Sequence, residues 1–554
     1  MTFIPIIPSL RPSLESVKCR TLHPDMLNQK NLNLNGTLGE LFRASISSFK
    51  DNMLADYSDG GALLTYGEAG EKCFAMDAVL TQAGIYKGDR VAILAENMPM
   101  WIVAFFSTTA FGRVVVPILP DCSANEVNNI LRHSQAKGIF ASKKQMPKID
   151  CENLEDLLMT IDIESLECKS LRECKTSQAG SGDCYVSPDD MAAIFYTSGT
   201  SGNAKGVMLS HRNIMHNIEC AKHIQKTYVT DVWLSILPMG HTFELSLGML
   251  LPFWTGAKIY YTRKSPTPAV LLKAFKAVRP TIMMSVPLII EKVYRKSIVP
   301  ELNKNWMIKL LRVIAPSIVY RKAGEKMLRR FGGRLRFFGI GAAKLDSEVE
   351  SFLKAAKFPY AIGYGMTECA PLIAVANVGH TKVGSTGKPV YEMKIRLDNL
   401  NPKTGEGEIV VSGDNVMMGY YKDPERTKEA FTADGWLRTG DLASMDKDGN
   451  ISIKGRRTNM ILGASGENIY PEEIEMVLAG IDGVDESLVK SDKGKLVAII
   501  KLNEFWTPGE DVAKRILSTA NPMLNKASQL SRIEFLEGEF EKTSTRKIRR
   551  YLYN

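Results

Sequence analysis

The chain has 554 residues, of which 45% are hydrophobic and 24% are charged. This length predicts two or more domains and a large buried core, and the composition is ordinary for a soluble globular protein. The formal net charge of +9 is modest, so the position of the charges matters more than their sum.

The cysteines and the N-terminus exclude several classes of protein. Nine scattered cysteines indicate reduced thiols rather than a disulfide framework, and the four between Cys151 and Cys184 are too widely spaced for a zinc site. The N-terminus is apolar but broken by prolines and lacks a basic start, so no secretory signal is predicted. The longest apolar stretch, Trp101–Leu119, contains a glycine, an arginine and a proline, so we expect a buried helix and a strand rather than a membrane span. A cytoplasmic protein is expected, with peripheral contact with the inner face of a membrane as an alternative.

From about residue 60, helix and strand signals alternate. Thr65 with Glu68, and Ser123 with Glu126, form capping-box patterns that predict helices reaching Gly84 and Ala136. Such alternation indicates βαβ units and parallel sheet. The other expected elements are a helix over Met100–Phe111 and strands over Arg90–Leu94, Val114–Leu119 and Gly138–Ala141.

The pattern changes further along the chain. Lys143–Asp189 is polar and lacks periodicity, so we expect a surface excursion there. Alternation resumes from Met191 to about Phe358, and after Gly384 short strands with turn residues indicate a small β-rich layer. The unit after Gly455–Thr458 combines a strand, Lys495–Leu502, with helices over Pro471–Leu478 and Glu510–Thr519. The predicted fold class is therefore α/β, with a large N-terminal domain of layered parallel sheets and helices, a β-rich subdomain and a small α+β C-terminal domain.

A loop rich in glycine and hydroxyl groups follows the apolar strand Ala192–Tyr196. Its ten residues, Thr197–Gly206, include three glycines, four serines or threonines and Lys205. Backbone amides, hydroxyls and a lysine can converge on one anion, which suits a polyphosphate. The spacing is not that of a Walker A loop. A flexible surface turn is the alternative, but the hydroxyl density, the lysine and the preceding strand favour phosphate binding.

The string YTSGTSGNAKG, residues 196–206, resembles the phosphate-binding motif of the adenylate-forming superfamily of AMP-binding enzymes. This superfamily includes acyl-CoA synthetases, luciferases and peptide-synthetase adenylation domains. The resemblance implies that ATP phosphates are held by this loop, with Thr200 acting in catalysis and as a Mg²⁺ ligand. The implied phosphate-binding residues are Thr197, Ser198, Gly199, Thr200, Ser201, Gly202 and Lys205.

Three further stretches resemble motifs of the same superfamily. Leu237–Glu244 is similar to a motif that the family carries on a strand, which would put His241 near the reacting carboxylate; a satisfied turn histidine is the alternative. Gly339–Ala343 and Gly363–Glu368 are similar to the strand ends that flank adenine, where Tyr364 would stack on the base. Glu368 would bind Mg²⁺, as a hard oxygen donor can. The other nucleotide-binding residues implied here are Gly341, Ala342, Gly363, Gly365 and Thr367.

The C-terminal part of the resemblance concerns ribose, the hinge and catalysis. Trp436–Asp441 is similar to the ribose motif, in which Asp441 accepts hydrogen bonds from the sugar hydroxyls. Arg456 would contact the nucleotide and act in catalysis, and Thr458 would be the hinge, where the family more often has Asp or Lys. Lys547 would be the catalytic lysine, although Arg546 replaces the usual glycine before it. Lys542 and Arg546 are nearby competitors for this role, and a solvated basic tail is the alternative. The implied CoA-binding loop comprises Gly463, Ser465, Gly466, Glu467 and Asn468.

These assignments divide the chain into an adenylation domain (1–455), a hinge (456–458) and a mobile C-terminal domain (459–554). The resemblance implies that a carboxylate attacks the α-phosphate of Mg·ATP and releases pyrophosphate. The small domain would then rotate, withdraw Lys547 and present the CoA loop, so that thioester formation releases AMP. The expected cofactors are ATP, Mg²⁺ and CoA.

Within the superfamily, the segments SGTSGNAKGVMLSH (residues 198–211) and LPMGHTFE (residues 237–244) are most similar to those of long-chain fatty acyl-CoA synthetases. The expected function is therefore activation of a medium- to long-chain fatty acid and its transfer to CoA. The alternatives are transfer to an acyl carrier protein, or adenylation alone. A non-catalytic nucleotide or lipid binder is disfavoured, because such a protein has little need of Lys547.

A strongly basic segment lies between Lys292 and Arg336, with thirteen lysines or arginines and two glutamates. Within it, Asn305–Ile314 interleaves apolar and basic residues in a pattern compatible with a helix. Such a surface suits an anionic membrane or an acidic carrier protein, while a solvated helix packed by its apolar face is the alternative. No nucleic-acid motif accompanies the charge, so nucleic-acid binding is not expected.

Overall fold

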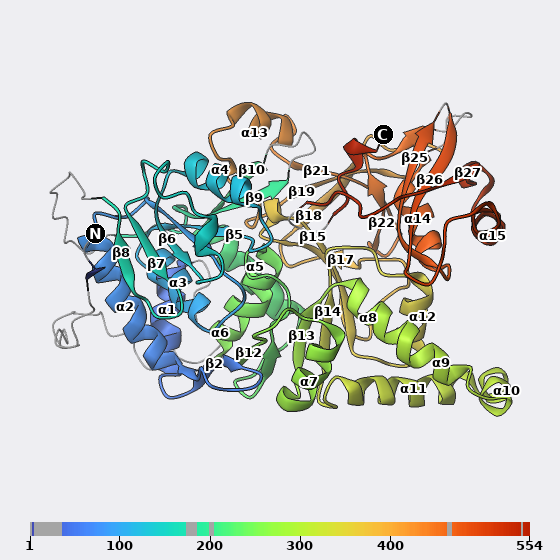
Figure 1. Cartoon of the computed structure of the whole chain (residues 1–554), viewed down its shortest axis with the longest axis horizontal. Helices are drawn as coiled ribbons and strands as arrows, with labels where there is room; N and C mark the ends of the chain where they lie inside the picture. The colour runs from blue at the N-terminus through green and yellow to red at the C-terminus, as the bar shows by residue number, and fades with distance from the viewer. Residues whose placement is uncertain are drawn as a thin grey trace.

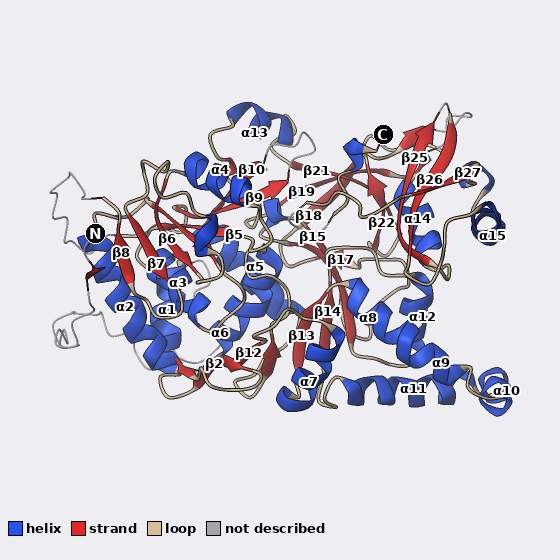
Figure 2. Ribbon diagram, viewed as in Figure 1, coloured by secondary structure: helices blue, strands red, loops and turns tan. Residues whose placement is uncertain are grey.

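The computed structural model describes residues 3–4, 36–172, 185–198, 204–462, 468–492, 494–543 and 547–553. Figures 1 and 2 show two large sheets with helices packed against them, a smaller sheet beside them, and a C-terminal unit at one end. The predicted α/β class is confirmed, with the C-terminal β-rich unit as expected.

The first large sheet carries the phosphate-loop segment near one edge. Its central strands β6, β4, β5 and β9 run parallel to one another, as the βαβ pattern predicts. Strand β10 turns back antiparallel to β9 and pairs with β20. Within the described residues the order is β1 (Phe3–Ile4), β8 (Cys168–Ser170), β7 (Met159–Asp162), β6 (Ala136–Ala141), β4 (Arg90–Leu94), β5 (Val114–Ile118), β9 (Met191–Ser198), β10 (Ala204–Ser210) and β20 (Gly419–Tyr420).

The second large sheet supplies the strand ends expected to flank adenine. Strands β14 and β15 are parallel neighbours, so their carboxyl ends lie side by side. The order, again within the described part of the chain, is β17 (Lys388–Pro389), β16 (Leu372–Ala376), β15 (Tyr360–Gly365), β14 (Phe337–Ile340), β13 (Ile282–Ser285), β11 (Val232–Leu234), β12 (Lys258–Tyr261), β2 (Met53–Tyr57) and β3 (Leu64–Thr65).

Helices fill the space between the two sheets and cover their outer faces. Helix α5, for example, contacts β10 of the first sheet and β16 of the second. The α-helices are α1 (Leu38–Ser48), α2 (Tyr66–Gln82), α3 (Met100–Thr109), α4 (Ala124–Ser134), α5 (His211–Ile224), α6 (Leu251–Thr255), α7 (Pro268–Val278), α8 (Pro287–Val293), α9 (Val299–Leu302), α10 (Trp306–Ile314), α11 (Pro316–Arg330), α12 (Ser347–Ala355), α13 (Pro424–Ala430), α14 (Pro471–Ala479) and α15 (Glu510–Ala520). Two segments, η3 (Glu244–Leu250) and η4 (Tyr294–Ile298), are π-helical, and short 3₁₀ turns are η2 (Met146–Lys148), η5 (Thr367–Cys369), η6 (Asn521–Met523), η7 (Lys526–Ser528) and η8 (Arg550–Leu552).

Smaller sheets complete the chain after residue 390. The β-rich layer is an antiparallel sheet of β18 (Lys394–Asp398), β19 (Gly407–Ser412), β21 (Leu437–Met445) and β22 (Ile451–Arg456). The C-terminal unit contains the pair β23 (Ile461–Leu462) and β24 (Asn468–Ile469), and the sheet β25 (Val484–Asp492), β26 (Lys495–Leu502) and β27 (Arg532–Phe535). It has its own apolar core, in which α14 and α15 pack against this sheet.

Local signals predicted most of the elements, with three corrections. Both predicted capping boxes are present, with Thr65 and Ser123 as N-caps. The helix expected to reach Ala136 ends at Ser134, because Gln135 adopts a left-handed conformation with φ 53°. The surface excursion expected over Lys143–Asp189 is wrong for its first part, since β7 and β8 extend the first sheet; residues 173–184 lie outside the described part. The motif containing His241 follows β11 as a turn and enters η3, so it does not lie on a strand.

Glu244 is a buried carboxyl group in η3 that the sequence analysis did not single out as ionisable. It is almost fully inaccessible, and a β-carbon at Gly248 would overlap it, which explains the glycine one turn later. One of its oxygens has no hydrogen-bond partner among the described residues. Burial raises the pKa of Glu244 to about 8, although a hydrogen bond from Ser235 opposes the shift.

We predict that Glu244→Gln stabilises the protein near neutral pH. The folded pKa lies above the ordinary carboxyl value, so the native state keeps a proton that the unfolded chain loses, and wild-type stability falls as pH rises from about 4.5 to 8. Glutamine removes this cost, which is on the order of a few kcal/mol near neutrality. Urea-unfolding midpoints should be higher for the variant near neutral pH and should converge with wild type towards pH 4.5. Identical pH dependence in both proteins would contradict the assignment, and the exposed Glu325→Gln is the control.

Candidate active site

The predicted phosphate loop lies at the tip of the β9–β10 hairpin. Thr197 and Lys205 are opposite each other in the antiparallel register, so they mark the two ends of the loop. The buried hydroxyl of Thr197 has no hydrogen-bond partner among the described residues, which leaves it able to donate to an anion. The side chain of Ser198 and the predicted residues Gly199, Thr200, Ser201 and Gly202 lie outside the described part.

Lys205 reaches from this hairpin to the second sheet. Its ammonium group lies 2.9 Å from Glu368 Oε1 and 2.6 Å from the hydroxyl of Tyr420, which itself donates to Glu368 at 2.9 Å. Glu368 is 4% exposed. Burial alone would raise the pKa of Glu368, but the Lys205 ammonium outweighs this effect and holds it below the ordinary value. The carboxylate is therefore ionised at neutral pH.

This ionised carboxylate fits the expected magnesium site. Mg²⁺ commonly binds one or two carboxylates together with substrate phosphates, rather than a cage made entirely of protein ligands. Among the described residues, no group of three or more His, Cys, Asp or Glu could hold a metal ion. Glu368 would supply a carboxylate next to the hairpin whose loop is expected to hold the phosphates. Of the two predicted ligands, Thr200 lies outside the described residues.

Asp441 lies at the centre of a second group of charged residues. Strand register places it opposite Arg456, and the Asp441 Oδ1 to Arg456 Nε distance is 2.9 Å. The hydroxyl of Tyr364 donates to the other carboxyl oxygen at 2.6 Å. Burial raises the pKa of Asp441, and Arg456 and Tyr364 counter that shift. The structure thus brings together three residues that the sequence had placed in separate motifs.

The predicted adenine-flanking residues line the ends of β14 and β15. Gly341 directly follows β14, and a β-carbon there would approach the Phe243 ring to 3.1 Å. Ala342 has a positive φ of 70° and is exposed. At the end of β15, a β-carbon at Gly365 would overlap the carbonyl group of Pro371, so only glycine fits. Gly363 lies within β15, and Thr367 begins the short turn that carries Glu368.

Lys547 lies in the same charged region although it comes from the end of the chain. It interacts electrostatically with Arg456, Asp441 and Glu368. The protein atoms packed around its ammonium group, and then the Arg456 guanidinium, lower the pKa of Lys547, while the two carboxylates oppose this change. Its rival Lys542 instead binds Glu486 at 2.6 Å within the C-terminal unit, and Arg546 lies outside the described residues.

His241 is also close to Lys547. Burial, with a smaller contribution from the Lys547 charge, lowers the pKa of His241 to about 4. The imidazole is therefore neutral at physiological pH, and it can accept or donate one hydrogen bond but carries no charge.

Polar contacts hold the C-terminal unit against the large domain. Arg549 Nη2 lies 3.2 Å from Oε1 of Glu126 on α4. The other carboxyl oxygen of Glu126 accepts a hydrogen bond from the backbone N–H of Ser123, the N-cap of that helix. Lys344 and Glu473 form a second ion pair at 3.6 Å. Both ion pairs are present in the conformation that brings Lys547 near Asp441.

The predicted hinge and CoA loop adjoin this interface. Thr458 is exposed in the turn after β22, and the next residue, Asn459, donates to Glu472 at 2.6 Å. Asn468 begins β24, whereas Gly463, Ser465, Gly466 and Glu467 lie outside the described residues. The hinge and the CoA-loop roles stay predictions.

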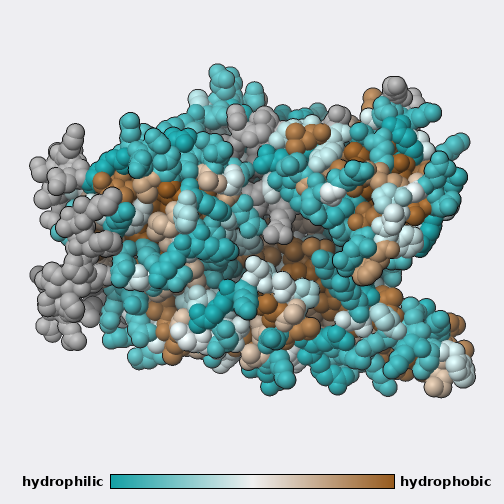
Figure 3. Space-filling view, viewed as in Figure 1, coloured by the Kyte–Doolittle hydropathy of each residue, from teal (hydrophilic) through white to brown (hydrophobic). Residues whose placement is uncertain are grey.

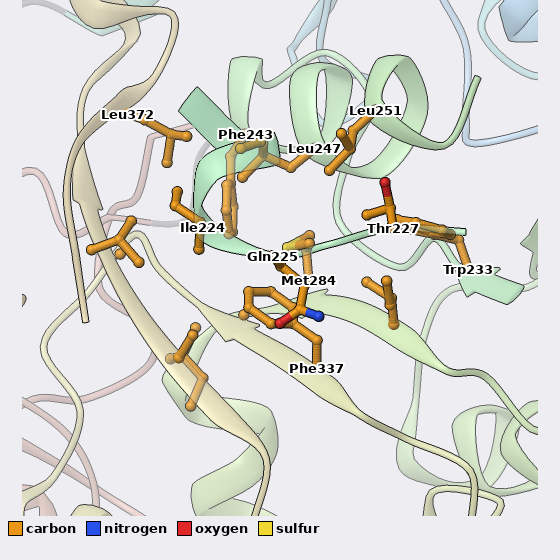
Figure 4. Close-up of a pocket in the computed structure, with 17 residues that line it drawn as sticks. Ile224, Gln225, Thr227, Trp233, Phe243, Leu247, Leu251, Met284, Phe337 and Leu372 are labelled. Atoms are coloured by element: carbon orange, nitrogen blue, oxygen red, sulfur yellow. The ribbon is translucent and has the colours of Figure 1, made fainter. Parts of the chain in front are cut away.

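An apolar pocket opens from the adenine-flanking strands into the large domain (Figure 4). Phe243, two residues after His241, lines it together with Gly363 and Leu372 on one side. Figure 4 shows Trp233 and Thr227 at the opposite end from Leu372. About 40 Å³ of the pocket can hold the centre of a water-sized sphere, and no charged side chain among the described residues lines it.

Comparison with known proteins identifies the family. The family model described as "AMP-binding enzyme" matches residues 42–421, which is more than half of the chain. This chain belongs to the AMP-binding enzymes. Its class is that of the AMP-forming acid–thiol ligases.

Individual relatives of this AMP-binding enzyme agree with that class. A peroxisomal long chain acyl-CoA synthetase 6 of Arabidopsis thaliana is 28% identical over 556 aligned residues, which cover 88% of this chain and 76% of the relative. Two solved structures share the fold. The anthranilate CoA ligase AuaEII, in complex with anthranoyl-AMP, has a TM-score of 0.76 at 20% identity and covers 95% of this chain and 98% of its own. An O-succinylbenzoate coenzyme A synthetase of Bacillus subtilis, in complex with ATP and magnesium ion, has a TM-score of 0.74 at 22% identity and covers 92% and 98%.

Two contacts in or near the candidate site were missed by sequence reasoning. Tyr420 is separated from Lys205 by 215 residues, and nothing local in its sequence marks it as a partner of a buried ion pair. Arg549 was counted within a basic tail, and its contact with Glu126 depends on how two domains meet. Both contacts require tertiary structure.

We predict that Arg549→Ala lowers the rate of ATP–pyrophosphate exchange by at most about fivefold. A half-exposed ion pair contributes up to about 1 kcal/mol, and here it helps to hold Lys547 in place. Lys490→Ala removes a pair with Glu534 inside the C-terminal unit and is the matched control. In a double-mutant cycle, the effects of Arg549→Ala and Glu126→Gln should not add. Additive effects would show that Arg549 and Glu126 do not influence pyrophosphate exchange through their contact.

Proposed function

We propose that this enzyme converts a medium- to long-chain fatty acid and ATP into an acyl-adenylate and pyrophosphate, and then transfers the acyl group to CoA with release of AMP. The observation that carries the proposal is the uncharged apolar pocket that Phe243 and Gly363 line. Two of its lining residues, Ile340 and Gly363, directly precede Gly341 and Tyr364, which are expected to flank adenine.

The pocket suits an alkyl chain better than a polar acid. Its lining is aliphatic and aromatic apart from Gln225 and Thr227, and neither residue is ionisable. Each buried methylene contributes roughly 0.8 kcal/mol, so a chain that fills the pocket gains affinity with length. The carboxylate stays at the polar end because burying it in the apolar part would be costly. The long-chain name of the plant relative supports the same substrate class.

In the first half-reaction, one carboxylate oxygen attacks the α-phosphorus of ATP and the bond to the bridging oxygen of pyrophosphate breaks. Thr197 and Lys205 hold the departing phosphates, and Asp441 accepts hydrogen bonds from the ribose hydroxyls. Lys547 supplies positive charge beside the attacking oxygen, where a positioned charge lowers the barrier most. Mg²⁺, held by Glu368, neutralises phosphate charge when bound.

In the second half-reaction, the thiolate of CoA attacks the acyl carbon and AMP leaves. Lys547 occupies the site needed for adenylation, so we propose that the C-terminal unit rotates about Thr458 before this step. The loop 463–468 then faces the acyl-adenylate. Transfer to a carrier protein and adenylation without transfer are the alternatives that the experiments below distinguish.

The direct test is ATP–pyrophosphate exchange with acids of graded chain length, followed by thioester formation with CoA or an acyl carrier protein. We expect exchange that strengthens with chain length, and thioester formation with CoA. Exchange only with short or aromatic acids would refute the fatty-acid assignment, and a thioester only with carrier protein would favour that alternative. Absence of exchange with every acid would refute the enzymatic proposal.

Lys547→Ala should abolish acyl-adenylate formation and leave thioester formation from a supplied acyl-adenylate largely intact. The reason is that the lysine acts on the charge of the first transition state only. Lys542→Ala is the matched control, because this lysine is paired with Glu486 away from the site. The two half-reactions are measured separately by pyrophosphate exchange and by thioester release. Equal loss in both would refute the assigned role of Lys547.

Leu251→Trp should shift preference towards shorter acids. Leu251 lines the pocket and lies with Thr227 and Trp233 in Figure 4, so added bulk there shortens the space available to the chain. Leu251→Met conserves volume and serves as control. The readout is the ratio of exchange rates for long and short acids. An unchanged ratio, with an unchanged unfolding midpoint, would mean that the chain does not occupy this pocket.

A further inference from the structure

Helix α10 presents its apolar face to solvent. The exposed fractions of Trp306, Val313 and Ile314 are 72%, 80% and 69%, and α10 contains no buried residue. At 100° per residue, its exposed apolar side chains span an arc of roughly 160°, whereas a surface helix normally turns that arc towards the core. The other exposed apolar residues of this face are Met307, Leu310, Leu311 and, at the start of α11, Ile318.

The helix lies at an extremity of the molecule. Figure 1 shows α11 along the lower edge with α10 at its far end, and Figure 3 shows apolar side chains at the corresponding lower right corner. Helix α10 contacts α11, its sequence neighbour. Its apolar face is therefore accessible to a large, flat partner.

Basic residues without partners surround this face. Arg295 and Arg336, elsewhere in the basic segment, are paired with Asp346 and Asp231, and Lys326 binds Glu301 at 2.5 Å. Other basic side chains of the segment form no ion pair with a described residue, and five of them lie on α10 or close to it in the chain. These are Lys304, Lys309, Arg312, Arg321 and Lys322.

We propose that α10, with the first turn of α11, binds the surface of an anionic lipid bilayer. Its apolar side chains enter the boundary between headgroups and acyl chains, and the five basic side chains contact lipid phosphates. An acidic protein would complement the charge, but the apolar face is broad and convex, which suits the interior of a bilayer. Within the described residues no helix is long and apolar enough to span a membrane, so this contact would be peripheral to the bilayer.

Binding can be tested without substrate, independently of the proposed reaction. The full chain is sedimented with vesicles of phosphatidylcholine alone or mixed with an equal part of phosphatidylglycerol. We expect binding to the mixed vesicles, weakened by salt. A variant carrying Trp306→Ser, Val313→Ser and Ile314→Ser should have an affinity for the mixed vesicles that is lower by about tenfold or more. The same loss of affinity is expected for Lys309→Glu combined with Arg312→Glu.

Controls separate this surface from general stickiness. Phe505→Ser with Met523→Ser removes exposed apolar side chains elsewhere, and should bind as wild type does. All variants should retain the wild-type midpoint of unfolding in urea, which shows that they are folded. Equal vesicle binding by the α10 variants and wild type would overturn the proposal. So would loss of binding to an acidic carrier protein with no change in vesicle binding.

Discussion

The ion pairs of two buried carboxylates, at the meeting point of three sheets, are the constraint on which the site depends. Glu368 pairs with Lys205, which is 163 residues away in the sequence. Asp441 pairs with Arg456, which lies opposite it on the neighbouring strand. Both carboxylates are buried, so removing Lys205 or Arg456 would leave a negative charge without compensation, which is strongly destabilising. Lys205 links the hairpin to Glu368 beside the second sheet, and Tyr364 of the second sheet donates to Asp441 of the β-rich layer. These contacts therefore fix the three parts relative to one another, and they involve the groups that a nucleotide is predicted to engage.

Lys547 extends this network to the C-terminal unit. Desolvation of its ammonium group and the charge of Arg456 lower the pKa of Lys547, and the carboxylates of Asp441 and Glu368 oppose this shift. A triphosphate entering the site brings negative charge, which favours the lysine further. Once pyrophosphate has left, that stabilisation is smaller, and the interface retains the half-exposed pairs of Arg549 and Lys344. Weak contacts of this kind suit the rotation that we propose for this unit.

Local chemistry in the sequence predicted much of the fold, whereas the site positions were predicted from the resemblance of whole motifs to those of a known family. Capping residues such as Thr65 and Ser123 act through neighbouring atoms, so their roles can be read from adjacent residues. Tyr420 could not be predicted as a ligand of Lys205, because strand pairing between β10 and β20 brings it there. The strands β7 and β8 were missed because they have only four and three residues and lie in a polar stretch without clear periodicity. The solvent-facing apolar arc of α10 likewise depends on its place at the edge of the molecule.

The central claim is that a carboxylate oxygen of the acid attacks the α-phosphorus of ATP. Turnover with an acid labelled with ¹⁸O in its carboxylate, followed by mass spectrometry of the phosphorus-containing products, tests it directly. The account predicts that one labelled oxygen appears in AMP and none in pyrophosphate. Label in orthophosphate, with ADP as the nucleotide product, would mean an acyl phosphate intermediate and would contradict the account.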